Sequence, residues 1–276
     1  MRFHWADYSG SIVTIVSVRT LAALIALTSI MPAQQPFYTD DADVTERGKF
    51  HLELSNQYSW LGAAALPTLR QNSLVYQLNY GLWKGLELGV DSPLLVVFNL
   101  EGTNPRRPYG NGDTNFTLKW NFRQQVVGSK WPALTVSFAV ETPTGDAASQ
   151  LGSGVADYGF NTVVQKSIGR SFIFRLNNGI VLSGNTLTGV VGLRAQGIVY
   201  TGGASVTRQV TSNLVLGIEV TGAVAQSSLL GKGALQTQFG GKYAVSENLT
   251  LDFGVLTGRL EGSPRAGLQV GICKDF

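Results

Sequence analysis

The chain has 276 residues, a net charge of +3, 14% charged residues and 33 glycines. Ordinary soluble domains carry about 25% charged residues and about 7% glycine, and this composition excludes a disordered chain or a coiled coil. A single cysteine and two histidines exclude an internal disulfide and any multi-cysteine metal site, and no basic run indicates nucleic-acid binding. Because no Walker, Rossmann, zinc or EF-hand pattern is present, we expect no cofactor and no metal.

The first predicted element is an export signal. Residues 20–31 form an uncharged, mostly apolar run that follows Arg19 and precedes Pro32 and Ala33. This arrangement is typical of the hydrophobic and cleavage regions of a secretory signal peptide. The alternative is a membrane anchor, but about 12 apolar residues are too few for a helix that spans roughly 30 Å of hydrocarbon. We therefore predict a signal peptide over residues 1–33, with its exact cleavage site and the true start codon left open.

From residue 48 onward, apolar and polar residues alternate along the chain. In one segment, for example, Phe116, Leu118 and Trp120 alternate with Thr117 and Lys119. A period of two residues indicates β-strands that have one apolar and one polar face. We count twelve such segments, at residues 48–60, 72–82, 85–92, 112–123, 132–142, 156–166, 171–183, 196–207, 213–223, 233–245, 249–259 and 264–276.

The lengths of these segments favour a membrane barrel over a soluble β-sandwich. Most contain 10–13 residues, whereas soluble strands average about 5–6 residues and a tilted membrane-spanning strand needs about 9–11. The connections alternate between short and long, as in outer-membrane barrels with short periplasmic turns and longer extracellular loops. We therefore predict an all-β protein in which residues 48–276 form an antiparallel transmembrane β-barrel of about 12 strands. Its predicted location is the outer membrane of a Gram-negative bacterium.

Aromatic residues gather where the predicted strands end. Amphipathic rings favour the membrane interface, and the alternative is a set of core aromatics in a soluble β-protein. Phe276 ends the last strand on its apolar face and resembles the sorting signal that the barrel-assembly machinery reads in bacterial outer-membrane proteins. We therefore expect that machinery and outer-membrane lipid as partners. The outer rim would carry Trp60, and the periplasmic rim would carry Trp83, Trp120, Phe122, Trp131 and Phe276.

The stretch before the first strand carries a family resemblance. It reads PFYTDDA from Pro36 to Ala42 and ERGKFHLEL from Glu46 to Leu54, and a later strand begins DYGF at Asp157. This pattern resembles the outer-membrane transporter family labelled "MetA-pathway of phenol degradation", whose members begin with a TDDA-like motif followed by E-x-G and a strand that carries Glu. The resemblance covers about 20–25 residues in motif and about 240 in architecture. It implies a barrel with a transport role and does not define the solute.

Residues 34–47 are predicted to be a periplasmic N-terminal segment. Within it, Thr39, Asp40 and Asp41 shortly precede the first strand. Asp and Thr side chains can accept backbone N–H bonds and fix a turn, which is the interpretation that the sequence favours. Two alternatives stay open: the segment plugs or gates the periplasmic mouth of the barrel, or the two acids bind a cation.

If the apolar faces point to lipid, the polar faces line the lumen. A Lys or Arg that faced lipid would cost about 2–4 kcal/mol at the bilayer midplane, which favours an inward orientation for the charged residues. One interpretation is a lumen that satisfies itself through salt bridges. The other is a narrow polar conduit for small solutes, because barrels of eight strands fill with side chains and barrels of sixteen leave a channel. The predicted pore-lining residues are Glu53, Glu87, Asp113, Lys119, Arg123, Asp157, Arg175, Glu219, Lys242 and Asp252.

Three classes of function are compatible with a barrel that has a polar inner face. The first is a porin-like channel or transporter for small solutes, with aromatic or hydrophobic compounds among the candidates. The second is a structural or adhesive barrel without transport. The third is an outer-membrane enzyme, but only His51 lies beyond the signal peptide, and its parity points inward with Glu53. A Ser–His triad facing lipid cannot be built from it, although His51 and Glu53 could pair. We therefore expect a channel that is not an enzyme.

Overall fold

Twelve long antiparallel strands and one short strand form the fold. The computed structural model describes residues 36–126, 128–169, 171–185, 194–225 and 233–276. The predicted signal peptide lies outside these residues, and the barrel belongs to one compact unit, Ala33–Phe276. No helix in the described ranges is long and apolar enough to cross a membrane.

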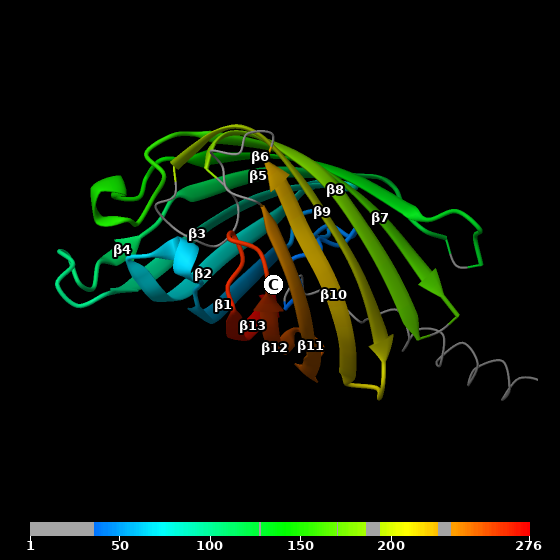
Figure 1. Ribbon diagram of the computed structural model, residues 1–276. Coiled ribbons are helices and arrows are strands. Elements are labelled where there is room, and N and C mark those ends of the chain that lie inside the picture. Colours follow the sequence, from blue (N-terminus) through cyan, green and yellow to red (C-terminus); the bar gives the residue numbers. More distant parts are fainter. Residues whose placement is uncertain (1–35, 127, 170, 186–193, 226–232) are drawn as a thin grey trace, which may run out of the picture. The chain divides into compact units, whose positions relative to one another are not determined.

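The long strands follow one another around the barrel in chain order (Figure 1). They have 10 to 16 residues each, and two single-turn 3₁₀ helices, η1 (Ala63–Ala65) and η2 (Ala147–Ser149), lie in the connections. The strands are β1 (Phe50–Trp60), β2 (Thr68–Trp83), β3 (Leu86–Asn99), β4 (Tyr109–Asn111), β5 (Thr114–Arg123), β6 (Ala133–Thr142), β7 (Asp157–Ile168), β8 (Phe172–Asn185), β9 (Arg194–Gln209), β10 (Leu214–Ala225), β11 (Ala234–Ser246), β12 (Leu249–Gly258) and β13 (Ala266–Asp275).

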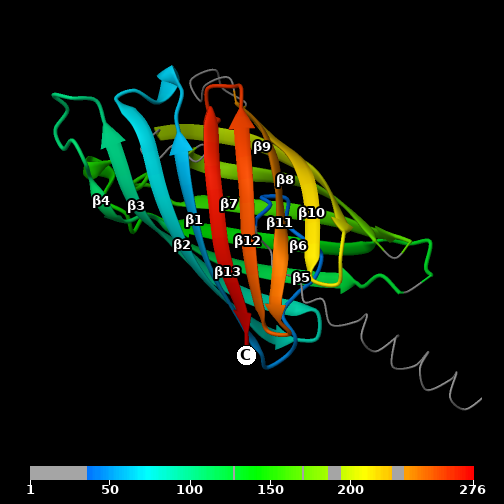
Figure 2. The same ribbon diagram turned by 90° about the horizontal axis from the view of Figure 1, so that it is seen from below.

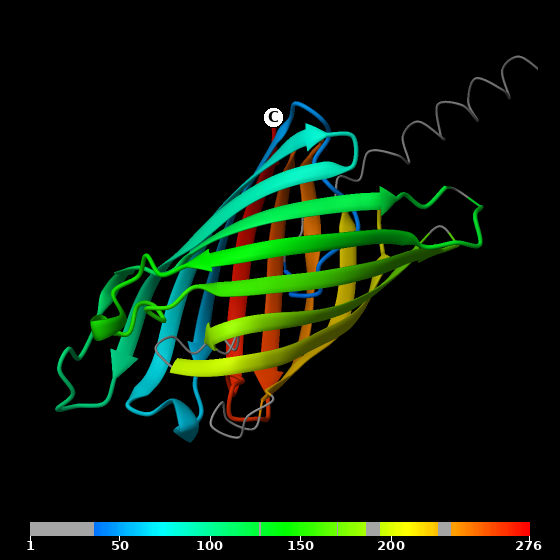
Figure 3. The same ribbon diagram turned by 90° about the horizontal axis from the view of Figure 1, so that it is seen from above.

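The sheet closes on itself through its first and last strands. β1 pairs with β13 on one side and with β2 on the other, and β2 continues the ring to β3. The short β4 pairs with the end of β3 and lies outside this continuous ring. Figures 2 and 3 show the strands inclined, so that β12 and β13 cross the direction of the strands on the opposite wall. The predicted antiparallel barrel with about 12 strands is confirmed.

The two faces of the wall differ in chemistry, as the alternation in the sequence predicts. Along β5, the apolar side chains of Phe116, Leu118 and Trp120 are exposed on the outside, and the polar side chains of Lys119 and Asn121 are buried on the inside. The other long strands repeat this pattern, and most of the large exposed side chains in the barrel are apolar. A continuous apolar outer face would be costly in water and stable against hydrocarbon.

The largest difference from the predicted strand boundaries lies in β3, which the sequence predicts to end just before Pro93. The strand instead continues through Pro93 to Asn99. Pro93 falls where β3 changes partner, since β3 pairs with β5 as far as Asp91 and with β4 from Leu94. Proline has no N–H to donate, so a break in the ladder accommodates it. Its carbonyl accepts a hydrogen bond from the Gly112 N–H at 2.7 Å.

The two rims of the barrel differ in the length of their connections. We call the rim that carries Phe50 and Phe276 the short-turn rim, because it includes the tight turn at 84–85. The opposite rim, which carries connections such as 143–156, is the long-loop rim. Phe50 and Phe276 are joined by two backbone hydrogen bonds of 3.3 and 3.0 Å, so the terminal residue belongs to the closure of the barrel.

Aromatic rings and cations meet at the short-turn rim. Such contacts let a ring lie on the apolar wall while the charge stays near water. They support the predicted interfacial position of these aromatics. The contacts place Arg47 over Trp83 at 4.5 Å, Arg123 over Trp131 at 4.8 Å and Lys274 over Phe276 at 4.9 Å.

Candidate functional site: the lumen and its N-terminal segment

Residues 36–45 of the N-terminal segment lie against the inner wall of the barrel. In Figure 3 its dark blue trace is seen within the ring of strands. Pro36 and Phe37 pack against glycines of the wall: a Cβ added at Gly217 would lie 2.9 Å from the Phe37 ring, and one at Gly240 would lie 3.0 Å from Pro36. Glycine at these places permits close approach of the segment, which gives part of the high glycine content a specific role.

A carboxylate on β10 holds the next part of the segment. Glu219 accepts hydrogen bonds from the backbone N–H of Tyr38 and of Thr39, both at 2.8 Å, and from the Thr39 hydroxyl at 2.7 Å. Glu219 is 1% exposed, so these bonds replace its contact with water. The Tyr38 hydroxyl also donates to the Gln57 side chain on β1. The segment is thus bound to two parts of the wall before it reaches its acidic residues.

A lysine on β5 holds the two acids. The Lys119 ammonium lies 2.8 Å from the Asp40 carboxylate and 3.1 Å from that of Asp41. Lys119 is 3% exposed. Burial by itself would raise the pKa of Asp41. The positive charges of Lys119 and Arg175 outweigh this effect and hold the pKa below its ordinary value of 3.8. Asp41 therefore stays ionised beside Lys119, and Asp40 lies within ion-pair distance of the same ammonium group.

Bonds to three further strands follow along the segment. The Ala42 N–H donates to Gln165 on β7 at 3.2 Å, and the Ala42 carbonyl accepts from Thr135 on β6 at 2.6 Å and from Asn121 on β5. Beyond it, the Thr45 N–H and hydroxyl both donate to Glu87 on β3 at 2.6 Å. Backbone groups that would otherwise be buried without partners are satisfied by wall side chains.

These contacts carry the segment across the bore. Glu219 on β10 and Lys119 on β5 belong to facing parts of the wall, because β6 to β9 lie between them on one side of the ring and six other long strands on the other. The motif residues Thr39, Asp40 and Asp41 use their side chains to bind these walls. The sequence favours a turn-fixing role for them, whereas the structure directs their side-chain bonds to β5 and β10.

A cavity of about 560 Å³ opens on the long-loop side of the segment. The segment contributes Tyr38 and Thr39 to its lining, and the wall contributes many small residues, among them Gly202 and Gly203. Part of the inner wall is apolar here: Val181, Val199 and Ala223 form a buried cluster against which Ala234 packs. The sequence predicts a polar inner face throughout, and this apolar patch is a difference from that prediction. Its cause is a run of small and β-branched residues at inward positions of β8 to β11.

The other predicted pore-lining residues have varied surroundings. Asp113 accepts hydrogen bonds from the backbone N–H of Gly145 at 2.9 Å and of Ser153 at 2.6 Å, and so fixes a long connection. Arg175 donates to Gln165 at 2.9 Å. Arg123 lies over the Trp131 ring at the short-turn rim. The remaining candidates on the inner wall are Glu53 beside His51 at the β1–β13 junction, buried Asp157, and Lys242, which pairs in register with buried Asp252.

Comparison with known proteins supports the fold assignment. No protein-family model matches the chain, and no curated protein sequence matches it. Among solved structures, an outer membrane channel from Pseudomonas putida F1 has a TM-score of 0.63 at 16% identity, over 88% of this chain and 99% of that chain. The NanC porin has a TM-score of 0.56 at 11% identity, over 81% and 98% of the two chains. The KdgM porin has a TM-score of 0.51 at 10% identity, over 82% and 99%. The chain therefore has the fold of outer-membrane porin-like barrels.

Proposed function

We propose that this protein is an outer-membrane channel for small solutes whose bore is closed by its own N-terminal segment. The observation that carries the proposal is the passage of residues 36–45 across the lumen, bound to Glu219 on one wall and to Lys119 on the facing wall. A barrel with a purely structural role would be stabilised more simply by side chains that fill its bore. A segment joined to the barrel at one end can leave the lumen without unfolding the sheet.

The proposed environment is the outer membrane, reached after export by the predicted signal peptide. The apolar outer face supports contact with lipid, and the aromatic residues of the short-turn rim support an interfacial position. The short-turn rim is proposed to face the periplasm. Phe276, at the barrel closure, is the proposed contact for the barrel-assembly machinery. Membership of the "MetA-pathway of phenol degradation" family, suggested by the motif at residues 39–42, forms part of the same proposal.

The cavity supports a proposal about the class of solute. Its volume of about 560 Å³ is in the range of sites that hold small organic molecules, about 300–1,000 Å³. Val181, Ala223 and Ala234 give one side an apolar surface, and Thr39 and Gln57 offer polar groups. A compact solute with an apolar or aromatic face and one polar group fits this lining better than a polyanion or a large sugar.

Planar-bilayer recordings on two variants test the channel proposal. Lys119→Met removes the charge that holds Asp40 and Asp41, and a loss of about 3 kcal/mol in such a tether would shift an equilibrium more than a hundredfold. We expect the time spent in a conducting state to rise at least tenfold. Arg123→Met is the matched control, because it also removes a cation from β5, but one that lies over the Trp131 ring and does not pair with Asp40 or Asp41. It should leave the conductance unchanged.

The outcomes separate the candidate functions. Increased conductance in Lys119→Met alone supports a channel that the segment closes. Correctly folded Lys119→Met that conducts no better than the native chain, with no uptake of small aromatic solutes into liposomes, would favour the structural or adhesive barrel. Equal increases in both variants would mean that general loosening of the barrel, and not release of the segment, opens it.

A further inference from the structure

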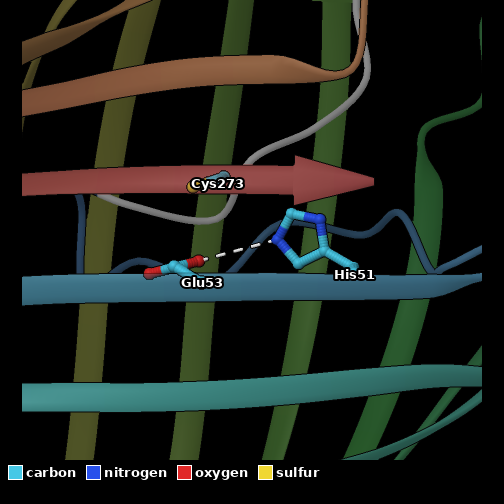
Figure 4. Close-up of side chains that lie close together, drawn as sticks. All are labelled: His51, Glu53 and Cys273. Atoms are coloured by element: carbon cyan, nitrogen blue, oxygen red, sulfur yellow. Dashed lines mark ion pairs between the residues drawn. The ribbon is translucent and has the colours of Figure 1, made fainter. Parts of the chain in front are cut away.

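A second group of polar side chains lies on the inner wall, at the junction where the barrel closes. His51 and Glu53 are two residues apart on β1 and share its inner face, and Glu53 is directly paired with Cys273 on β13. Figure 4 shows the three side chains together, with Cys273 on the strand next to the other two. They are 5%, 1% and 2% exposed, respectively. None of them contributes to the binding of the N-terminal segment described above.

The donor atoms of these side chains converge. One ligand atom from each of His51, Glu53 and Cys273 lies within 4.8 Å of the other two. The His51 Nε2 atom and the Glu53 Oε2 atom are 3.7 Å apart, and neither makes a hydrogen bond to any residue in the described part of the chain. Buried polar atoms without hydrogen bonds are costly, so two at one point call for a partner.

The orientation of His51 shows which kind of partner the two atoms need. Its Nδ1 atom lies 2.8 Å from the Asp275 carboxylate. A carboxylate is an acceptor, so Nδ1 carries the proton and donates it, and the neutral ring then presents a lone pair at Nε2. This lone pair faces Glu53 Oε2, which is also an acceptor. Two acceptors at this separation need a cation between them, either a second ring proton or a metal ion. In metal sites, the ring nitrogen of a histidine that does not bind the metal commonly donates its proton to a carboxylate.

We propose that His51, Glu53 and Cys273 form a binding site for a divalent transition-metal ion of the zinc class. Imidazole nitrogen, thiolate sulfur and carboxylate oxygen together suit zinc, whereas calcium and magnesium prefer all-oxygen sites. The Cys273 thiol donates to Asp252 at 2.9 Å, and Asp252 retains a buried oxygen without a hydrogen bond to a described residue. As the sulfur–metal bond forms, the thiol proton passes to the Asp252 carboxylate that accepts it in the hydrogen bond, and a water molecule supplies the fourth ligand.

The position of the site gives it a structural consequence. His51 and Glu53 lie on β1 and Cys273 lies on β13, so a bound ion would join the first and last strands of the sheet. These strands are connected to each other by hydrogen bonds and by no turn. An ion that binds the closed barrel and not the unfolded chain shifts folding toward closure. The proposal does not depend on whether the barrel conducts.

Cobalt and zinc titrations of the purified full-length mature barrel in detergent test the site. We expect one equivalent of Co²⁺ to bind with a thiolate-to-cobalt charge-transfer absorption, and one equivalent of Zn²⁺ to abolish that absorption by displacement. Cys273→Ser should lose the absorption, and His51→Gln should weaken binding at least tenfold. Asp275→Asn, which removes the carboxylate that orients His51, should weaken it about 10–100-fold. Ser55→Ala is the matched control, since Ser55 is buried on the same face of β1, and should bind as the native chain does.

Heat-modifiable migration on gels reports whether each variant has formed a barrel. Cobalt binding by the native chain is itself a test, and it needs no variant. Cobalt absorption without a thiolate band, or no binding by the folded native chain, overturns the proposal and leaves a doubly protonated His51 between Asp275 and Glu53. Binding that Cys273→Ser and His51→Gln leave unchanged in folded protein overturns it as well.

Discussion

The two halves of the lumen differ in chemistry. Toward the short-turn rim, Glu219, Lys119 and Glu87 hold the N-terminal segment through charge-assisted hydrogen bonds and ion pairs. Toward the long-loop rim, the wall turns small and partly apolar around Val181 and Val199, and a cavity of about 560 Å³ remains. The same strands build both halves, since β8 to β11 run through each of them.

This difference separates closure of the bore from binding of a solute. Charged groups buried with their partners bind one segment tightly and in one register. A cavity lined by small residues makes few directional demands, so it suits solutes that vary in shape. We therefore expect substitutions in the short-turn half to change stability and opening, and substitutions in the long-loop half to change which solutes pass.

The largest expected effect is on stability. Glu219→Leu would leave two backbone N–H groups and the Thr39 hydroxyl without their acceptor, and losses of this kind cost about 1–3 kcal/mol each. We expect the free energy of unfolding to fall by about 3–5 kcal/mol in urea titrations of barrel reconstituted in vesicles. Thr221→Ser, on the same face of β10 but beside the cavity, is the control, because it removes a single methyl group and should change the free energy of unfolding by no more than about 1 kcal/mol. Equal losses would contradict the division of the lumen.

A pH effect should also belong to the short-turn half. The pKa of Asp41 lies below its ordinary value of 3.8, because the nearby cations outweigh the effect of burial. The stability that Asp41 contributes is therefore present above pH 3.8 and is lost as the pH falls through its lowered pKa. Bilayer recordings should show a closed barrel near neutral pH and opening below about pH 3.8. Asp41→Asn should lack this transition; a transition that persists there would assign it to another group.

The fold follows from the sequence because a period of two residues and strand length are local signals. Phe116, Leu118 and Trp120 identify the outer face of β5 without any knowledge of its neighbours. The extension of β3 could not be predicted in the same way, because the tolerance of Pro93 depends on where its partners change. Boundaries depend on pairing, and pairing is a property of the closed sheet.

The site was predictable in its parts and not in its assembly. Parity identifies Lys119 and Glu219 as inward candidates, and the motif points to residues 39–41. These wall residues bind segment residues that lie up to 181 positions away in the sequence, as Glu219 binds Tyr38. No local pattern encodes such a separation. The same holds for His51 and Asp275, 224 residues apart. Sequence spacing predicted no metal site because the proposed ligands converge only when β1 meets β13.

A smaller effect is expected on solute preference, from substitutions in the long-loop half of the lumen. Replacing Val181 and Ala223 together by Ser would make the apolar lining of the cavity more polar, and each buried CH₂ group contributes about 0.8 kcal/mol, or about fourfold in affinity. In liposome uptake assays we expect the permeation of a small aromatic alcohol, relative to a pentose, to fall several-fold. The free energy of unfolding should change much less than in Glu219→Leu. An unchanged ratio would place the solute path elsewhere in the barrel.

The smallest effect is expected at the short-turn rim, outside both halves of the lumen. Parity in the sequence makes Arg123 a pore-lining candidate, but its guanidinium lies 4.8 Å from the Trp131 ring, and that ring is 64% exposed. A cation–ring contact at an exposed site contributes about 0.5–1 kcal/mol. Arg123→Met retains much of the apolar contact of the side chain with the ring and loses the charge. We therefore expect the free energy of unfolding in vesicles to fall by no more than about 1 kcal/mol, with ion selectivity unchanged in bilayer recordings. A clear shift toward cation selectivity would show that Arg123 reaches the conducting path. The charged lining of the short-turn half would then extend as far as the short-turn rim.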